Sequence, residues 1–164
     1  MGSEEIREEV IMKIDPRFIC DEQLGRLAKW LRLQGFDTVF KCPMEDSELI
    51  RIAQSEKRFL LTRDHHLPAK TLWEGVVVIE ESHYARQMEE LRKKVKLPKT
   101  KPFTRCLDCN ELIQSLPKAE VQGRVPEEVA KSYDRFYTCP SCRKIFWRGS
   151  HIKNSEAALN RLKK

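Results

Sequence analysis

The stretch that decides the fold is RFICDEQLGRLAKWLRLQG, residues 17–35. Its first four residues form a short apolar run that ends at the acids Asp21 and Glu22, which is typical of a strand with an acidic carboxyl end. Apolar residues then recur at helical spacing, and Gly35 follows as a C-terminal stop. Those apolar residues are Leu24, Leu27, Ala28 and Leu31. The stretch therefore predicts a strand that leads directly into a helix.

The same alternation continues along the first half of the chain. The further strand-like runs are residues 36–40, 59–62 and 76–79, and helical patterns begin at Asp46-Ser47, which supplies an N-cap, and at Tyr84. Strands that alternate with helices predict a parallel sheet with crossover helices. In such sheets, ligands bind outside the carboxyl ends of the strands. We therefore expect a site where Asp21, Asp64 and Glu80 follow their strands.

Composition limits the class of protein. The chain has 164 residues, of which 40% are hydrophobic and 34% are charged, against a typical charged share of about 25%. Its longest aliphatic run is residues 76–79, far short of the roughly 20 residues that a membrane helix needs. The acidic N-terminus does not fit the basic start of a secretory signal. We expect a soluble, cytoplasmic protein with no membrane partner.

Charge is distributed unevenly between the two halves of the chain. Residues 1–85 carry 12 basic and 16 acidic side chains, whereas residues 86–164 carry 19 basic and 9 acidic ones. A basic half of this kind favours a polyanion-binding segment, although solvated charged faces give the same pattern. A break rich in proline and lysine, LPKTKP, spans residues 97–102. The predicted domains are a lead-in at residues 1–16, an α/β domain at 17–97 and a cysteine-containing domain at 98–164.

The second half contains two Cys-x-x-Cys pairs. They are Cys106 with Cys109 and Cys139 with Cys142. Two such turns supply the four thiolates of a closed, tetrahedral structural zinc site, whereas a redox Cys-x-x-Cys would stand alone. The intervening segment is too small for an adequate core of its own, so zinc would supply much of its folding energy. A closed four-sulfur site has no open position for a substrate, so we assign it no catalysis.

Three aspartates are the catalytic candidates. Asp21, Asp46 and Asp64 each also suit a helix N-cap, but parallel topology would bring them to one edge of the sheet. A cluster of carboxylates suits Mg²⁺ or Mn²⁺, and such a metal can activate water for attack on a phosphodiester. A receiver-like phosphoacceptor would also place aspartates here. It would need a lysine at a later strand end, where Glu80-Glu81 stands instead.

The motifs together resemble one known family. CDEQLGRLAKWLR, residues 20–32, resembles the opening motif of the Mut-seven C-terminal RNase domain family, a branch of the PIN-like nucleases. LLTRD, residues 60–64, is similar to its second signature. RCLDCN at 105–110, CPSC at 139–142 and WRGSH at 147–151 resemble its appended zinc ribbon. The resemblance runs from about residue 18 to residue 151.

The resemblance implies a fold and an activity. The fold would be a PIN-like three-layer α/β/α sandwich with a parallel sheet, followed by a small zinc-ribbon domain. The pattern of residues from Asn154 to Lys163 itself predicts a capped C-terminal helix after the ribbon. The activity would be that of a Mg²⁺- or Mn²⁺-dependent ribonuclease. Asp21 and Asp64 would be metal ligands, and Asp46 would fill the second acidic position, with Glu48 as the competing choice.

One position departs from the family pattern. Related PIN-like proteins often carry an acid two residues after the position of Asp64, and this chain has His66 there. Either Glu80 or Glu81 completes the cluster, or the site has three acids and binds its metal weakly.

The basic half then has a predicted partner, single-stranded RNA. Basic side chains would contact phosphates, and interleaved aromatic rings would stack on unpaired bases, although most of those rings also suit the small core of the ribbon. The candidate RNA-binding residues are Arg63, Lys99, Lys101, Arg105, Arg143, Lys144 and Arg148.

Two hypotheses about function follow from these predictions. One is an endoribonuclease whose zinc ribbon grips RNA. The other is an RNA-binding module that keeps the nuclease fold with little or no catalysis.

Overall fold

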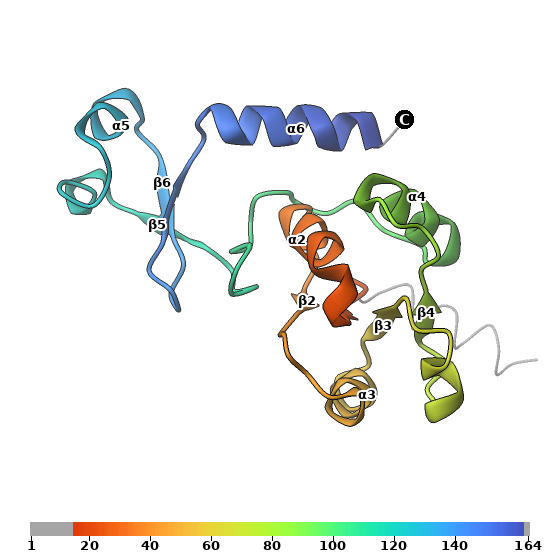
Figure 1. Ribbon diagram of the computed structural model, residues 1–164. Helices are drawn as coiled ribbons and strands as arrows, with labels where there is room; N and C mark the ends of the chain where they lie inside the picture. The colour runs from red at the N-terminus through yellow and green to blue at the C-terminus, as the bar shows by residue number, and fades with distance from the viewer. Residues whose placement is uncertain (1–14, 163–164) are drawn as a thin grey trace, which may run out of the picture. The chain divides into compact units, whose positions relative to one another are not determined.

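Four parallel strands form the sheet of the first structural unit (Figure 1). The computed structural model describes residues 15–162, and the predicted lead-in lies outside the described residues except for Asp15 and Pro16. The strands run in the order β2-β1-β3-β4. The elements of this unit are β1 (Phe18–Cys20), η1 (Glu22–Leu24), α2 (Gly25–Leu33), β2 (Thr38–Val39), α3 (Asp46–Ser55), β3 (Phe59–Thr62), η2 (Leu67–Lys70), β4 (Val76–Val78) and α4 (Tyr84–Lys94). The predicted parallel sheet with crossover helices is confirmed.

Side chains of the strands alternate between two apolar cores, as the period of a β-strand requires. Phe18, Cys20, Leu61 and Val77 pack with buried side chains of α2 and α4, whereas Ile19, Leu60 and Val76 pack with α3. The sheet is thus covered by helices on both faces. Each fully buried leucine or phenylalanine contributes about 1.5–3 kcal/mol. This three-layer arrangement of helix, sheet and helix fits the predicted fold class.

The helix that follows β1 ends as the sequence predicts. Gly35 has a φ of +97°, which glycine adopts without strain. Its amide donates to the carbonyl of Arg32, and the amide of Phe36 donates to the carbonyl of Leu31. These two bonds form a Schellman motif, which satisfies the last carbonyls of α2 and turns the chain toward β2.

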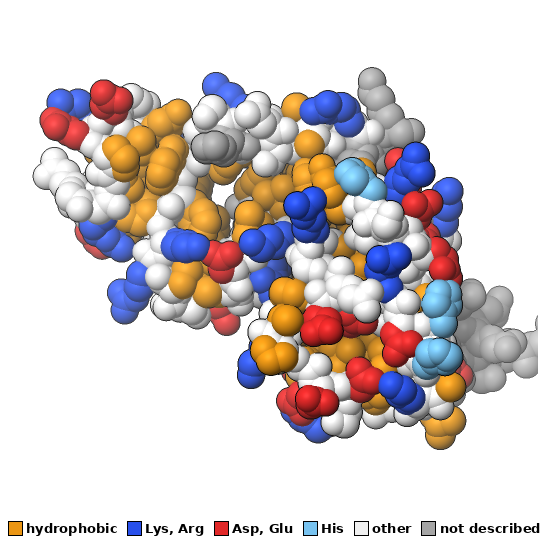
Figure 2. Space-filling view, in the orientation of Figure 1, with side chains coloured by type: hydrophobic (Ala, Val, Ile, Leu, Met, Phe, Trp, Pro, Cys, Tyr) orange, Lys and Arg blue, Asp and Glu red, His pale blue; other side chains and the backbone are white. Residues whose placement is uncertain are grey.

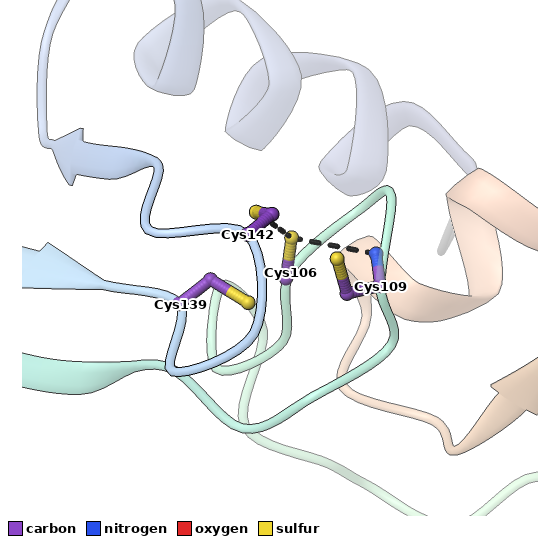
Figure 3. A group of neighbouring side chains, drawn as sticks. All are labelled: Cys106, Cys109, Cys139 and Cys142. Atoms are coloured by element: carbon purple, nitrogen blue, oxygen red, sulfur yellow. Dashed lines mark hydrogen bonds between the residues drawn. The ribbon is translucent and has the colours of Figure 1, made fainter.

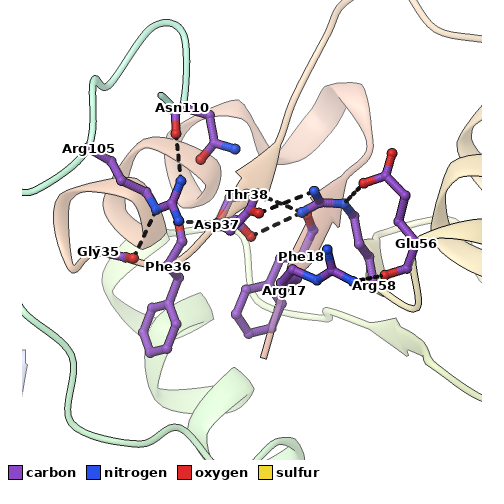
Figure 4. A network of polar contacts seen from close by, with 10 residues as sticks. All are labelled: Arg17, Phe18, Gly35, Phe36, Asp37, Thr38, Glu56, Arg58, Arg105 and Asn110. Atoms are coloured by element: carbon purple, nitrogen blue, oxygen red, sulfur yellow. Dashed lines mark hydrogen bonds and ion pairs between the residues drawn. The ribbon is translucent and has the colours of Figure 1, made fainter. Parts of the chain in front are cut away.

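A buried arginine holds the amino-terminal edge of the sheet together (Figure 4). Arg58 is 6% exposed, and its guanidinium donates to the carboxylates of Asp37 and Glu56 and to the carbonyl of Phe18. Burial lowers the pKa of Arg58, but the hydrogen bonds that it donates to its two carboxylate partners more than offset this and raise the pKa. The charge is therefore retained, and it joins β1 to the segments that precede β2 and β3.

The second structural unit is built on an antiparallel sheet. It comprises Arg32–Gly35 and the described residues from Lys101 onward. Its strands lie in the order β5-β6-β7, and its elements are β5 (Gln114–Leu116), η3 (Lys118–Glu120), α5 (Glu127–Ser132), β6 (Phe136–Thr138), β7 (Ile145–Trp147) and α6 (Ser150–Leu162). Leu116, Val121 and Phe136 form the buried part of its apolar core. Such a small core needs another source of stability.

Several boundaries differ from those that the sequence predicted. α6 begins at Ser150 rather than about Asn154. The N-cap of α3 is Glu45, and Asp46 is the first helical residue. The second strand is confined to Thr38–Val39 within the predicted 36–40, because only these residues pair with β1. Within residues 15–162, no helix is both long and apolar enough to cross a membrane.

Replacing Arg58 by methionine tests the role of the buried network. Arg58→Met should lower the free energy of unfolding by about 2–3 kcal/mol, because it leaves Asp37 and a buried carbonyl without their donor. Arg51→Met is the matched control, since Arg51 pairs with Glu48 on an exposed turn of α3 and should change stability by about 0.5 kcal/mol or less. Urea denaturation measures both. Equal losses in the two variants would contradict this role.

Candidate functional site

A pocket of about 610 Å³ opens at the carboxyl edge of the parallel sheet. The predicted acids Asp21, Asp46 and Asp64 all line it, together with Arg63. Other residues of its wall are Lys41, Met44, Glu45, Leu49, His65 and His66. Figure 2 shows acidic and histidine side chains gathered on the surface of this unit, with basic side chains among them. The topology thus brings the three predicted aspartates to one pocket.

Asp21 and Asp64 are joined through Thr62, the last residue of β3. The buried hydroxyl of Thr62 donates to Asp21 Oδ2 at 2.5 Å and accepts from the amide of Asp64 at 2.9 Å. Parallel register places Cys20 beside Leu61, and the amide of Asp21 donates to the Leu61 carbonyl at 3.0 Å. The two carboxylates therefore project from adjacent, hydrogen-bonded strand ends.

Each of these two carboxylates also orders the turn that follows it. Asp21 Oδ1 accepts from the amide of Gln23 at 2.8 Å and caps η1, and Asp64 Oδ1 accepts from the amide of His66 at 2.8 Å. The N-cap role that the sequence offered as the alternative for Asp21 is thus present. A carboxylate oxygen has further lone pairs, so these hydrogen bonds orient the groups and leave capacity for a cation.

Asp46 reaches the pocket from the first turn of α3. Its Oδ2 lies 2.6 Å from Lys70 Nζ, and the same Nζ lies 3.9 Å from Asp64 Oδ2. The hydrogen bond that Lys70 donates to Asp46 raises the pKa of Lys70. The ammonium group of Lys70 therefore contacts carboxylates from two elements, α3 and the turn after β3.

The donor set fits a hard divalent cation. Carboxylate oxygens are the ligands that Mg²⁺ and Mn²⁺ prefer, and the ammonium at Asp46 and Asp64 shows that a cation is accommodated there. The oxygens of the three aspartates are more widely spaced than a compact ligand set. Among the side chains that the structure describes, only the four paired cysteines place three or more ligand atoms of cysteine, histidine or carboxylate within 4.8 Å of one another.

The additional acids lie outside the lining of this pocket. Glu48 forms a two-pronged ion pair with Arg51, which lowers the pKa of Glu48. Glu80 Oε2 lies 3.2 Å from His65 Nε2. The amides of Glu80 and Glu81 both donate to the carboxylate of Glu90, which fixes the start of the loop after β4.

The predicted RNA-binding side chains differ in how they are engaged. Arg105 donates to the carbonyls of Gly35 and Asn110 (Figure 4), and Lys144 pairs with Asp108. Arg148 pairs with Glu156 at 3.4 Å. Arg63 is half-buried, with its Nη2 3.4 Å from the Glu80 carbonyl and its Nε buried without a partner. The side chains of Lys99, Lys101 and Arg143 are exposed.

Two knuckles of the same construction hold the four cysteines (Figure 3). In the first, the amide of Asn110 donates to the carbonyl of Cys106, and in the second the amide of Arg143 donates to the carbonyl of Cys139. Asn110 and Arg143 have φ values of 68° and 62°, in the left-handed region. This shared turn directs both sulfurs of each pair toward the same point.

The spacing of the sulfurs fits zinc. A tetrahedron of thiolates at a Zn–S distance of about 2.3 Å has edges of about 3.8 Å. The Sγ atoms of Cys106 and Cys142 are 3.8 Å apart, and all four Sγ atoms lie within 4.8 Å of one another. Cys106 and Cys139 are fully buried, so the site is closed on that side. Four close cysteines of this geometry can bind one zinc ion and leave no position for a substrate.

The thiols of the cluster cannot all ionise without a metal. The backbone amide of Lys144 lowers the pKa of Cys142 to about 7. A hydrogen bond with Cys142 raises the pKa of Cys109 to about 12, and burial raises the pKa of Cys106. A bound dication would replace the protons that the thiols share and would stabilise all four as thiolates, which is the expected behaviour of a structural zinc site.

Two residues that bond to the predicted aspartates could not be identified from the sequence. Thr62 lies within the LLTRD stretch, and its side-chain bonds to Asp21 and Asp64 depend on the register of β1 and β3. Lys70 lies 24 residues from Asp46 in the chain, within a short η2 segment that carries no motif. Only the folded chain brings its ammonium to the carboxylates.

One comparison with known proteins identifies a family. The family model described as Mut7-C RNAse domain matches residues 16–159. Comparison with curated proteins and with solved structures gave no significant match.

The four-cysteine cluster predicts one zinc ion per chain. Cys139→Ser should lower the zinc content to near zero and unfold the ribbon, because zinc supplies much of the folding free energy of so small a core. Cys42→Ser is the matched control, since Cys42 is an exposed cysteine of the other unit and should keep the full zinc content. Elemental analysis of the purified chain measures zinc per protein. Retention of one zinc in Cys139→Ser would rule out this ligand set.

Proposed function

The chain belongs to the Mut7-C RNAse domain family, and from this we propose that it is a metal-dependent ribonuclease that hydrolyses RNA phosphodiesters. The observation that carries the proposal is that Asp21, Asp46, Asp64 and Arg63 all line the same pocket. RNA is the substrate class that the family implies. The finer assignments, endonucleolytic action on single-stranded RNA and a PIN-like fold, are parts of the same proposal.

Different residues at the pocket have different proposed roles: positioning the carboxylates, binding the metal and binding the RNA phosphate. Thr62 holds the carboxylate of Asp21 and the backbone of Asp64 in fixed positions. Asp21, Asp46 and Asp64 would hold Mg²⁺ or Mn²⁺. When bound at such carboxylates, a divalent metal activates water and stabilises the leaving oxygen. Arg63 lies in the same wall, and its guanidinium is suited to bind a phosphate oxygen of the RNA.

The ribbon is suited to grip the RNA strand. The side chains of Tyr137 and Phe146 lie opposite each other on β6 and β7 and are half-buried. They alternate along their strands with Phe136, Ile145 and Trp147, which pack in or against the apolar core. Aromatic rings at such positions can stack on unpaired bases, and the exposed Arg143 lies in the turn between the two strands. We propose that this surface contacts single-stranded RNA.

A second function, RNA binding without efficient cleavage, is favoured by one observation. The Lys70 ammonium already neutralises Asp46 and lies near Asp64. A pocket that keeps this arrangement would bind RNA through Arg63 and the ribbon without turnover. Cleavage assays therefore distinguish the two functions.

Cleavage of single-stranded RNA in the presence of Mn²⁺ tests the catalytic assignment. Asp21→Asn and Asp64→Asn should each reduce the cleavage rate by about 100-fold or more, since each removes a charge that stabilises the transition state. Asp15→Asn is the matched control, because Asp15 is exposed and precedes the sheet. If the wild type binds RNA but does not cleave it, and the variants bind RNA equally well, the second function is favoured. Equal cleavage rates in all variants and the wild type would refute the catalytic role assigned to Asp21 and Asp64.

Salt dependence of binding tests the ribbon surface. Each phosphate contact on a single strand contributes about 0.7 to the slope of log K against log salt, so Arg143→Gln should reduce that slope by about this amount. Lys131→Gln should leave the slope unchanged, because Lys131 already pairs with Glu127 on α5. Fluorescence anisotropy with labelled oligonucleotides, at several salt concentrations, measures the slopes. An equal slope in Arg143→Gln and the wild type would remove Arg143 from the interface.

A further inference from the structure

The ammonium group of Lys70 lies against two carboxylates of the acidic pocket, those of Asp46 and Asp64. Nζ lies 2.6 Å from Asp46 Oδ2 and 3.9 Å from Asp64 Oδ2, so one positive charge serves carboxylates from two elements. Lys70 is the last residue of η2, which directly follows the turn that Asp64 orders. The Lys70 ammonium therefore contacts Asp64, which lies in the turn just before η2, and Asp46, which lies on α3.

The position of this charge follows from electrostatics. Carboxylates gathered at one edge repel one another, and the repulsion costs free energy unless a positive charge lies between them. Two basic side chains line the pocket, Lys41 and Arg63, but the Nη2 of Arg63 donates to the backbone carbonyl of Glu80 rather than to a carboxylate. Lys70 thus supplies the compensating charge at Asp46 and Asp64.

The ammonium and a divalent metal cannot both occupy this position. A metal ligated by Asp46 Oδ2 needs the lone pairs that Lys70 now uses, and two cations at contact distance would repel each other. The Lys70 side chain is 47% exposed, so rotation of its flexible stem can carry the charged end into solvent while the backbone of η2 stays in place.

We propose that Lys70 is a resident counter-cation that a divalent metal must displace to bind Asp46 and Asp64 together. This inference rests on the proposed metal-dependent function. It makes the metal affinity of the pocket lower than that of its carboxylates alone. Without metal, the same contact offsets the repulsion between the two carboxylates, and a metal binds them together only when its concentration is high enough to displace the lysine.

Binding of Mn²⁺ to the zinc-loaded chain, measured by isothermal titration calorimetry, tests the proposal without reference to activity. Lys70→Gln should bind Mn²⁺ about tenfold more tightly than the wild type, because the competing charge is gone. Lys70→Arg retains the charge and should bind Mn²⁺ no more tightly than the wild type. Lys118→Gln is the matched control, since Lys118 forms an exposed pair with Asp134 in the other unit, and it should leave the affinity unchanged.

The outcomes separate this proposal from the proposed function. Tighter binding in Lys70→Gln that is lost again in the double variant with Asp64→Asn supports displacement. Binding in Lys70→Gln that equals or falls below that of the wild type, while Asp64→Asn still abolishes it, overturns displacement and leaves the metal site standing. Absence of Mn²⁺ binding in every variant, or binding that Asp64→Asn does not change, overturns both. Circular dichroism checks that each variant is folded.

Discussion

The hydrogen bond from the Thr62 hydroxyl to Asp21 joins the carboxyl ends of β1 and β3, and the geometry of the acidic pocket depends on it. The bond forms because the strands are parallel and in a register that sets Cys20 beside Leu61. The same oxygen accepts from the amide of Asp64, so a single buried side chain fixes both aspartates. In an antiparallel sheet, these two strand ends would lie at opposite edges.

The two structural units obtain their stability in different ways. The first buries two apolar cores, one on each face of its sheet, and places its charged network at the edge opposite the acidic pocket, where Arg58 bonds Asp37 and Glu56. The second has only a small core around Phe136, and its two cysteine knuckles are suited to a metal that would supply the remainder. The two candidate metal sites are therefore separate, because the carboxylates of the acidic pocket belong to the first unit and the four cysteines belong to the second.

Much of this arrangement could be predicted from the sequence, since it depends on local patterns. The alternation of apolar runs with helical spacing predicts the parallel sheet, and that topology predicts that Asp21 and Asp64 share an edge. Gly35 marks a helix end through its own backbone preference, and the cysteine pairs predict their cluster by spacing alone. The start of α6 was predicted too late, because Asn154, a residue type that favours N-caps, lies inside the helix rather than at its start.

Side-chain pairing between distant segments could not be predicted in this way. The contact of Lys70 with Asp46 and the bonds of Thr62 depend on how η2, α3 and β3 meet in space. The segment between the knuckles also carried no periodic signal long enough to reveal β5 and the six-residue α5. Such contacts decide whether carboxylates at a sheet edge are available to a metal, so the chemistry of the pocket needed the folded chain.

The central claim is that the carboxyl edge of the parallel sheet forms a divalent-cation site from Asp21, Asp46 and Asp64. Anomalous X-ray diffraction from crystals of the zinc-loaded chain soaked in Mn²⁺ tests it most directly, because manganese and zinc are distinguished by their absorption edges. We expect a manganese peak among the three carboxylates, with Lys70 turned away from Asp46. A fully zinc-loaded ribbon together with no manganese at the sheet edge, and Lys70 still bonded to Asp46, would contradict it.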